Sequence, residues 1–277
     1  MNIRGVFIHP VKSCQRIALN QSEVTHNGLI WDREFMLVDR DNCFMTQRDY
    51  PQMAKIQVQL QGGTLIFSVA GSLPEPLSLE PNTTGQELAV KIWRDQTIAI
   101  DQGDPVADWF HRALNLRDDQ ACRLVRQSSS HARLVNPKYA VRETDTVSFA
   151  DGYPLLLTNT ASLDELNRRL QQTYSDLTST VPMIRFRPNL VVETEQSFIE
   201  DNWRRIQVGT VQFDVVKPCD RCIVTTTDQA TGERNPVKEP LKTLATFRKQ
   251  SGGVMFGQNL IPRTTGIVRV GDPVVVL

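Results

Sequence analysis

Long apolar runs, runs of one charge and repeated cysteine or histidine pairs are all missing from this sequence of 277 residues. Its apolar runs are far too short to cross a bilayer, and the N-terminal segment MNIRGVFIHPVKS has the pattern of a strand rather than of a signal peptide. Lys and Arg together number 31, as do Asp and Glu, so the formal net charge is zero. This balance argues against a basic surface for a nucleic-acid polymer or a membrane. Any anionic ligand must therefore be bound by a few individual Lys or Arg side chains at its site.

Cysteine is also scarce. The five cysteines are Cys14, Cys43, Cys122, Cys219 and Cys222, and their number and spacing do not suggest a disulfide framework. An odd and sparse set argues against structural disulfides and favours a reducing compartment. We therefore expect a soluble, unprocessed, cytoplasmic protein without a membrane partner.

Short β-rich segments fill the first hundred residues, separated by turn-forming residues. They are IRGVFI, RIALNQSEVT, EFMLVD, AKIQVQL, TLIFSVA, LAVKIW and TIAID. Such spacing is typical of a sandwich or barrel rather than of a βαβ fold. The segment PVADWFHRALN has a proline near its start and apolar residues at helical spacing, which predicts a helix that closes a first domain of residues 1–118.

The second predicted domain, residues 119–277, mixes strands with two helices. Ser162 and Glu165 form a capping-box pattern that predicts the start of the helix LDELNRRLQQTY, and EPLKTLATFRKQ predicts another helix. The strand-like segments are YPLLLTN, NLVVE, RRIQVG, VQFDVV, IVTTT and IVRVGDPVVVL. The polar segment 127–146 is predicted to be a long loop. The expected fold class is α+β, predominantly β, with a barrel-like N-terminal domain and helices flanking a second β domain.

The pair Cys219 and Cys222 in VKPCDRC allows several kinds of chemistry. A zinc site needs two further ligands, and neither a second cysteine pair nor a histidine pair is present. A thioredoxin-type dithiol belongs at the start of a helix, whereas the following IVTTT is β-branched and favours a strand. Two partly buried free thiols, or one thiol bound to a heavier metal, remain open at this point.

Cations recur next to small polar residues in three other segments. Lys12 and Ser13 follow the first expected strand in PVKSC, and Arg33 lies just beyond a glycine turn in GLIWDR. In RFRPN, Arg185 and Arg187 fall on one side of an alternating segment and precede an amide. Lys and Arg bind phosphate, and amide groups bind the edge of a heterocycle. Together these segments favour an anionic cofactor.

The sequence resembles the MOSC family over nearly its whole length. It resembles the members that have an N-terminal β-barrel domain, among them the mitochondrial amidoxime-reducing component and its bacterial relatives. The matching segments are PVKSC, GLIWDREFMLVD, FMTQR, YPLLLTNTASLDELN, RFRPNLVV, VKPCDRCIVTTTDQATGE, FGQNLI and RVGDPVVVL. The resemblance implies an N-terminal MOSC β-barrel domain followed by a MOSC β-barrel domain. It also implies a molybdenum cofactor (Mo-molybdopterin) whose metal is bound by the second cysteine of CxRC, which is Cys222 here. A soft metal with sulfur ligands suits a thiolate.

The family pattern further implies which residues hold the cofactor. They are Lys12, Ser13, Arg33, Thr158, Asn159, Arg185, Arg187, Asn189 and Gln258. Lys12 and Ser13 are expected to contact the pterin and its phosphate, and Arg33 to clamp the phosphate. Arg187 and Asn189 are expected to hold the pterin near the metal. The remaining four would line the pterin or lie close by, and Cys219 would have a packing or supporting role.

The resemblance implies a reductase of N-hydroxylated compounds, namely hydroxylamines, amidoximes and N-hydroxylated base analogues. The length and polarity of the segment 127–146 make it a candidate substrate mouth. Some bacterial relatives continue into a plant-type ferredoxin domain, but this sequence has no C-x4-C-x2-C pattern. Electrons are therefore expected from a separate flavoprotein or iron–sulfur reductase. The alternatives are a non-catalytic module that binds the molybdenum cofactor or carries sulfur, and a thiol–disulfide oxidoreductase that needs both Cys219 and Cys222.

Overall fold

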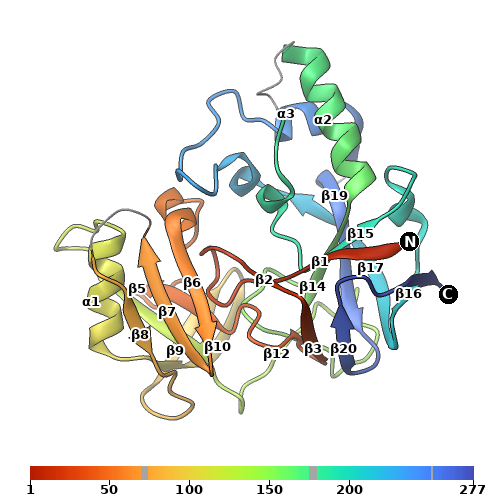
Figure 1. Ribbon diagram of the computed structural model, residues 1–277. Helices are drawn as coiled ribbons and strands as arrows, with labels where there is room; N and C mark the ends of the chain where they lie inside the picture. Colours follow the sequence, from red (N-terminus) through yellow and green to blue (C-terminus); the bar gives the residue numbers. More distant parts are fainter. Residues whose placement is uncertain (70–73, 175–179, 251) are drawn as a thin grey trace.

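The computed structural model describes residues 1–69, 74–174, 180–250 and 252–277 (Figure 1). Its largest sheet runs in the order β2-β1-β15-β14-β19-β17-β16-β21, with β18 paired to β19, and only the β14–β15 pair is parallel. The strands are β1 (Asn2–Ile8), β2 (Ile17–Leu19), β14 (Leu155–Asn159), β15 (Leu190–Glu193), β16 (Arg205–Val208), β17 (Val211–Arg221), β18 (Lys249–Gln250), β19 (Gly253–Pro262) and β21 (Val274–Val276). The predominantly β fold is confirmed.

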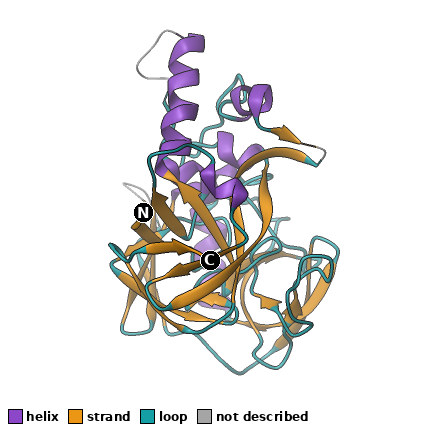
Figure 2. Ribbon diagram, turned by 90° about the vertical axis from the view of Figure 1, so that its right-hand side faces the viewer, coloured by secondary structure: helices purple, strands orange, loops and turns teal. Residues whose placement is uncertain are grey.

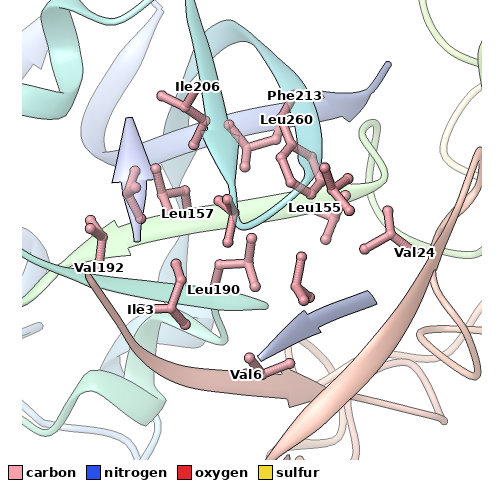
Figure 3. Close-up of a cluster of buried hydrophobic side chains, with 14 of the residues drawn as sticks. Ile3, Val6, Val24, Leu155, Leu157, Leu190, Val192, Ile206, Phe213 and Leu260 are labelled. Atoms are coloured by element: carbon pink, nitrogen blue, oxygen red, sulfur yellow. The ribbon is translucent and has the colours of Figure 1, made fainter. Parts of the chain in front are cut away.

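One apolar cluster fills the space under this sheet (Figure 3). A register shift between Ile3 and Gly5 interrupts the alternation of β1 and turns both Ile3 and Val6 inward, where they are fully buried with Leu157 and Leu190 of the central strands. Strands β1 and β2 are thus part of a sheet whose other strands come from the second half of the chain. A small sheet of β20 (Gly266–Arg269), β3 (Gln21–Thr25) and β4 (Gly28–Leu29) joins the two chain ends in the same way. The division of the chain into two domains at residue 118 stays a prediction. In the structure, strands β1 and β3 pair with strands β15 and β20 from the second half of the chain.

The rest of the N-terminal part forms two smaller sheets beside the large one (Figure 1). One contains β5 (Phe35–Asp39), β11 (Cys122–Gln127), β10 (Asp95–Asp101) and β9 (Glu87–Ile92), and the other contains β6 (Ile56–Gln61), β7 (Thr64–Val69) and β8 (Leu77–Leu79). The predicted helix is confirmed as α1 (Asp104–Ala113), whose Trp109 and Phe110 pack on Phe67. The predicted strand RIALNQSEVT is divided into β2 and β3, and Ala70, the last residue of TLIFSVA, lies outside the described residues.

Helix α2 (Thr160–Tyr174) begins three residues earlier than the capping-box pattern predicts and stands above the strands (Figure 2). Its first turn is capped by Asn159, whose side-chain oxygen accepts from the Ala161 amide at 3.1 Å. The Ser162 side chain does not cap the helix, because its oxygen accepts from the Phe198 amide at 2.8 Å while its hydroxyl donates to the buried Glu200 carboxylate at 2.7 Å. Helix α3 (Leu241–Phe247) is confirmed, and no helix in the described part of the chain is long and apolar enough to cross a membrane.

The described ranges also contain four 3-10 turns and one short strand pair. They are the 3-10 turns η1 (Pro51–Lys55), η3 (Met183–Phe186), η4 (Ile199–Asn202) and η5 (Ile223–Thr226), and the strand pair β12 (Arg133–Leu134) with β13 (Thr146–Val147). The pairing of β12 with β13 closes the ends of the polar segment 127–146, which is otherwise without regular structure as predicted.

Candidate active site

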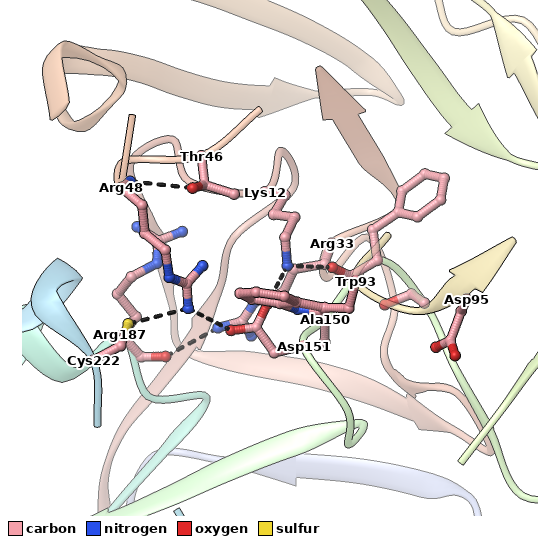
Figure 4. Close-up of polar contacts among 12 residues, drawn as sticks. Lys12, Arg33, Thr46, Arg48, Trp93, Asp95, Ala150, Asp151, Arg187 and Cys222 are labelled. Atoms are coloured by element: carbon pink, nitrogen blue, oxygen red, sulfur yellow. Dashed lines mark hydrogen bonds and ion pairs between the residues drawn. The ribbon is translucent and has the colours of Figure 1, made fainter. Parts of the chain in front are cut away.

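A cleft of about 130 Å³ lies where the turn after β1, the N-terminal sheets and the end of β17 meet (Figure 4). Six of the predicted site residues line it: Lys12, Ser13, Arg33, Arg187, Asn189 and Cys222. Five of the lining side chains are cations and one is a carboxylate, so the cleft carries excess positive charge.

The backbone at three of these positions lies in the left-handed region, where L residues are uncommon. Ser13 has φ 70°, Arg33 φ 50° and Arg187 φ 54°. Such conformations cost about 1–3 kcal/mol each and gather at functional sites. The expectation that RFRPN alternates as an extended segment is wrong, because residues 183–186 form the turn η3 and Arg187 then reverses the chain. Arg187 therefore points into the cleft while Arg185 does not.

Cys222 lies at the point where β17 ends and the single turn η5 begins. The prediction of a strand over IVTTT is wrong. The Thr225 hydroxyl donates to the Cys222 carbonyl at 2.9 Å and the Thr226 hydroxyl donates to the Ile223 carbonyl at 2.7 Å, so local side-chain bonds stabilise the turn. The thiol faces the cleft, and its sulfur accepts a hydrogen bond from Nη2 of Arg48 at 3.2 Å.

A second set of contacts connects Lys12 to Arg48 through Asp151 (Figure 4). The buried Lys12 ammonium donates to the Phe149 carbonyl at 2.9 Å and to Asp151 at 2.5 Å. Nη2 of Arg48 lies 3.7 Å from the same carboxylate, and the Trp93 indole donates to it at 3.1 Å. Desolvation opposes ionisation of Asp151, but the Lys12 and Arg48 cations outweigh it and hold the pKa of this carboxyl well below its usual value. Asp151 is therefore a poor proton donor at neutral pH.

Arg33 is held rigidly at the back of the cleft. Its guanidinium donates to Asp32 at 2.5 Å, to the Asn189 side-chain oxygen at 2.8 Å and to the Arg187 carbonyl at 3.0 Å. The Asn189 oxygen also accepts from the Leu156 amide at 3.1 Å, so it is already fully used. In this arrangement Asn189 positions Arg33.

Arg187 is a half-buried cation of the cleft. Its guanidinium donates to the Cys14 carbonyl at 2.7 Å and forms no ion pair with a side chain in the described ranges. Desolvation, followed by repulsion from Arg33, lowers the pKa of Arg187 to about 9. Arg33 and Arg187, after burial itself, also lower the pKa of the fully buried His9, whose ring nitrogens have no hydrogen-bond partner among the described residues. An anion in the cleft would relieve this concentration of positive charge.

Four predicted site residues lie away from the cleft lining and have structural contacts. Thr158 is completely buried in β14, and Asn159 bonds Thr194, Glu200 and the start of α2. Arg185 donates to Asp228 at 2.9 Å, and Gln258 donates to Asp201 at 2.7 Å.

Two functional candidates were missed by the sequence reasoning: Arg48 and Asp151. Arg48 ends the matched segment FMTQR, so that segment was the signal that could have found it. Asp151 precedes the buried strand β14 by only a few residues, and no pattern singles it out. Arg221 donates to the sulfur of Cys219 at 2.9 Å rather than to Cys222. The two cysteines thus each face a different arginine.

The residues of the cleft fit an anionic cofactor with a thiol-bound metal. Five cations against one carboxylate, a guanidinium without an ion pair and an accessible sulfur supply charge and a soft ligand together. A zinc site lacks support, because no group of three His, Cys, Asp or Glu side chains suited to a metal is found in the part of the chain that the structure describes. The five cysteines are all free.

The fold and the cleft define a predominantly β protein whose cationic cleft is lined by the thiols of Cys219 and Cys222. Comparisons with known proteins identify its family. The MOSC N-terminal beta barrel domain matches residues 1–117 and the MOSC domain matches residues 144–275. "Mitochondrial amidoxime-reducing component 1" of Mus musculus is 30% identical, over 99% of this chain and 82% of its own length. Two proteins named "Molybdenum cofactor sulfurase" are also similar. That of Oryza sativa subsp. japonica is 31% identical over 93% of this chain and 32% of its own length. That of Anopheles gambiae is 34% identical over 90% of this chain and 33% of its own length. The chain belongs to the MOSC family, in the form with an N-terminal MOSC β-barrel domain.

Proposed function

We propose that this protein is a reductase of N-hydroxylated compounds that binds Mo-molybdopterin with Cys222 as the protein ligand of molybdenum. The observation that carries the proposal is the Cys222 thiol in a cleft lined by five cations and one carboxylate. Membership of the MOSC family and similarity to amidoxime-reducing components over almost the whole chain support the same reaction class.

The proposal assigns a task to each cation of the cleft. Lys12 and Arg187 would bind the phosphate and pterin oxygens, since both line the cleft and are already oriented by backbone carbonyls. Arg33 would complete this anion site, with Asn189 fixing its guanidinium. Ser13 would donate a hydroxyl from its left-handed turn. Arg48 would stay beside the Cys222 sulfur and balance its negative charge once it is a thiolate.

The cofactor, when bound, would supply the two-electron chemistry that removes oxygen from an N–OH group. Substrates would be hydroxylamines, amidoximes or N-hydroxylated base analogues. A separate flavoprotein or iron–sulfur reductase would deliver the electrons. We further propose a cytoplasmic location, which the five free cysteines support.

A second candidate is a module that binds the molybdenum cofactor or carries sulfur on Cys222 without reducing a substrate. The similarity to two molybdenum cofactor sulfurases, each over at least 90% of this chain, favours it. A thiol–disulfide oxidoreductase is a third candidate, and it requires both Cys219 and Cys222.

Metal content tests the proposal directly. The wild type, Cys222→Ala and the matched control Cys219→Ala are produced in a host that makes the cofactor, and molybdenum and pterin are measured per chain. We expect near-stoichiometric molybdenum in the wild type and the control, and a large loss in Cys222→Ala. Benzamidoxime reduction with an artificial electron donor should follow the metal content. Loaded protein without any turnover would favour the carrier, and equal loss of activity in both variants would favour the dithiol.

A further inference from the structure

A second, larger cavity of about 920 Å³ lies directly beside the cleft. The two share Asp151, Gly152 and Tyr153 in their walls, so a molecule in the large cavity can reach the smaller one. The polar segment 127–146 contributes several residues to the wall, which agrees with its predicted place at a substrate mouth.

Aromatic side chains from two separate parts of the chain line this cavity. Trp93, in the turn between β9 and β10, packs against Phe44 with ring centroids 4.9 Å apart. Tyr139 and Tyr153, from the second half, form an edge-to-face pair with centroids 6.0 Å apart. Flat rings that form part of a cavity wall favour a flat, apolar ligand.

Trp93 is placed unusually for a large apolar residue. It is 48% exposed, and its backbone lies in the left-handed region at φ 55°. Its indole donates to Asp151 at 3.1 Å, and the Arg48 guanidinium lies over its ring, 4.4 Å from the centroid. Because the same arginine bonds the Cys222 sulfur, the aromatic wall is one residue away from the thiol.

The charges of this cavity differ from those of the cleft. Arg133 is already satisfied by Asp95 at 2.7 Å and by the carbonyls of Ser148, Ala150 and Asp151. The Lys217 ammonium lies over the Tyr139 ring, 5.2 Å from its centroid. Arg133 is thus not available to hold an anion, while Arg94 and Lys217 also line the cavity beside the four aromatic side chains.

We propose that the aromatic cavity binds the planar ring of an uncharged aryl N-hydroxylated substrate and that Trp93 determines this specificity. The inference rests on the proposed function, because the ring would lie here while the N–OH group lies near Cys222. Alkyl N-hydroxylated compounds would leave the cavity unfilled and bind more weakly.

Calorimetric binding of benzamidoxime and acetamidoxime tests the cavity without requiring turnover. Both carry the same reacting group, and only the first has a ring. We expect the wild type to bind benzamidoxime more tightly and Trp93→Ala to lose about tenfold of this preference, as one aromatic contact with its buried area predicts. Trp93→Phe, which keeps a ring but lacks the indole donor to Asp151, should keep the preference. Far-UV circular dichroism and thermal unfolding show that each variant is folded.

The kcat/KM ratio of the two amidoximes gives the second readout on loaded enzyme. If Trp93 only positions Arg48, both substrates should lose the same factor and the ratio should stay unchanged, which would overturn the inference. Equal affinity of the wild type for both compounds would also overturn it. Ring-selective, Trp93-dependent binding without reduction would support the cavity and contradict the proposed function instead.

Discussion

The ion pair between Lys12 and Asp151 should respond very differently to the loss of one partner or the other. The Lys12 side chain is 7% exposed, whereas that of Asp151 is 59% exposed. Asp151→Asn therefore leaves an ammonium that water can hardly reach without its compensating negative charge, with the Phe149 carbonyl at 2.9 Å and the new amide oxygen as neutral acceptors. Lys12→Met leaves a carboxylate that water can hydrate and that still contacts Arg48 and Trp93.

The magnitude follows from the burial of each group. Breaking a fully buried pair from one side costs about 3–5 kcal/mol, and an exposed pair contributes about 0–1 kcal/mol. With one partner buried and the other half exposed, we expect Asp151→Asn to lower the free energy of unfolding by about 2 kcal/mol. Lys12→Met should cost less than about 1 kcal/mol, because the stranded group is hydrated.

Urea unfolding of the cofactor-free protein measures both values. The pKa of Asp151 is depressed in the folded state, so its stabilising effect is present above its unfolded pKa of about 4 and is lost only as the pH falls through the lower folded pKa. The difference between the variants should hence be constant from about pH 5 to pH 7. A larger loss in Lys12→Met than in Asp151→Asn would refute the reasoning.

Three further outcomes are expected. The pKa of buried His9 is lowered, so the unfolded state takes up a proton at a higher pH than the folded state does. The free energy of unfolding should therefore fall below about pH 6.5, by up to about 1.4 kcal/mol per pH unit. In urea unfolding at several pH values, His9→Leu should remove that part of the pH dependence. Gly257→Ala should lower the free energy of unfolding by more than about 2 kcal/mol, because Gly257 has φ +81° and a Cβ there would lie 2.6 Å from a backbone carbonyl oxygen. The control Gly62→Ala should cost only about 1 kcal/mol, because Gly62 has φ +59° but no neighbour within 4 Å. In native alkylation followed by peptide mass spectrometry, Cys14 and Cys122 should stay unmodified while the three half-exposed cysteines react, because burial raises the pKa of these two thiols to about 12 and about 11.

Strands and helices with a strong period were predictable from the sequence, and short turns built by side-chain hydrogen bonds were not. The β-rich segment of β1 and the helical spacing of α1 both appear in the structure as predicted. The IVTTT segment has the composition of a strand, yet its Thr225 and Thr226 hydroxyls close a 3-10 turn. Propensity averages over contexts and cannot include such local bonds.

The site was predictable to the extent that its residues belong to matched segments. Lys12, Arg33, Arg187 and Cys222 all reach the cleft. Asp151 was not predictable, since its importance arises from the ammonium that it meets across the fold, 139 positions away in the sequence. Patterns within one segment carry no information on such a partner.

The assembly of the cleft explains why an anionic site of this kind requires the whole chain. Strand β1 pairs with β15, and the Phe7 amide donates to the Asn189 carbonyl at 2.8 Å, so the register of one strand pair brings the turn after β1 next to Arg187. Arg48 comes from the N-terminal sheets, whereas Cys222 comes from the end of β17 in the second half. The second half supplies Cys222 with Arg187 and Arg221, whereas Lys12, Arg33 and Arg48 come from the first half. Binding of an anionic cofactor would therefore stabilise the contact between the two halves, because it offsets the repulsion among cations that each half contributes.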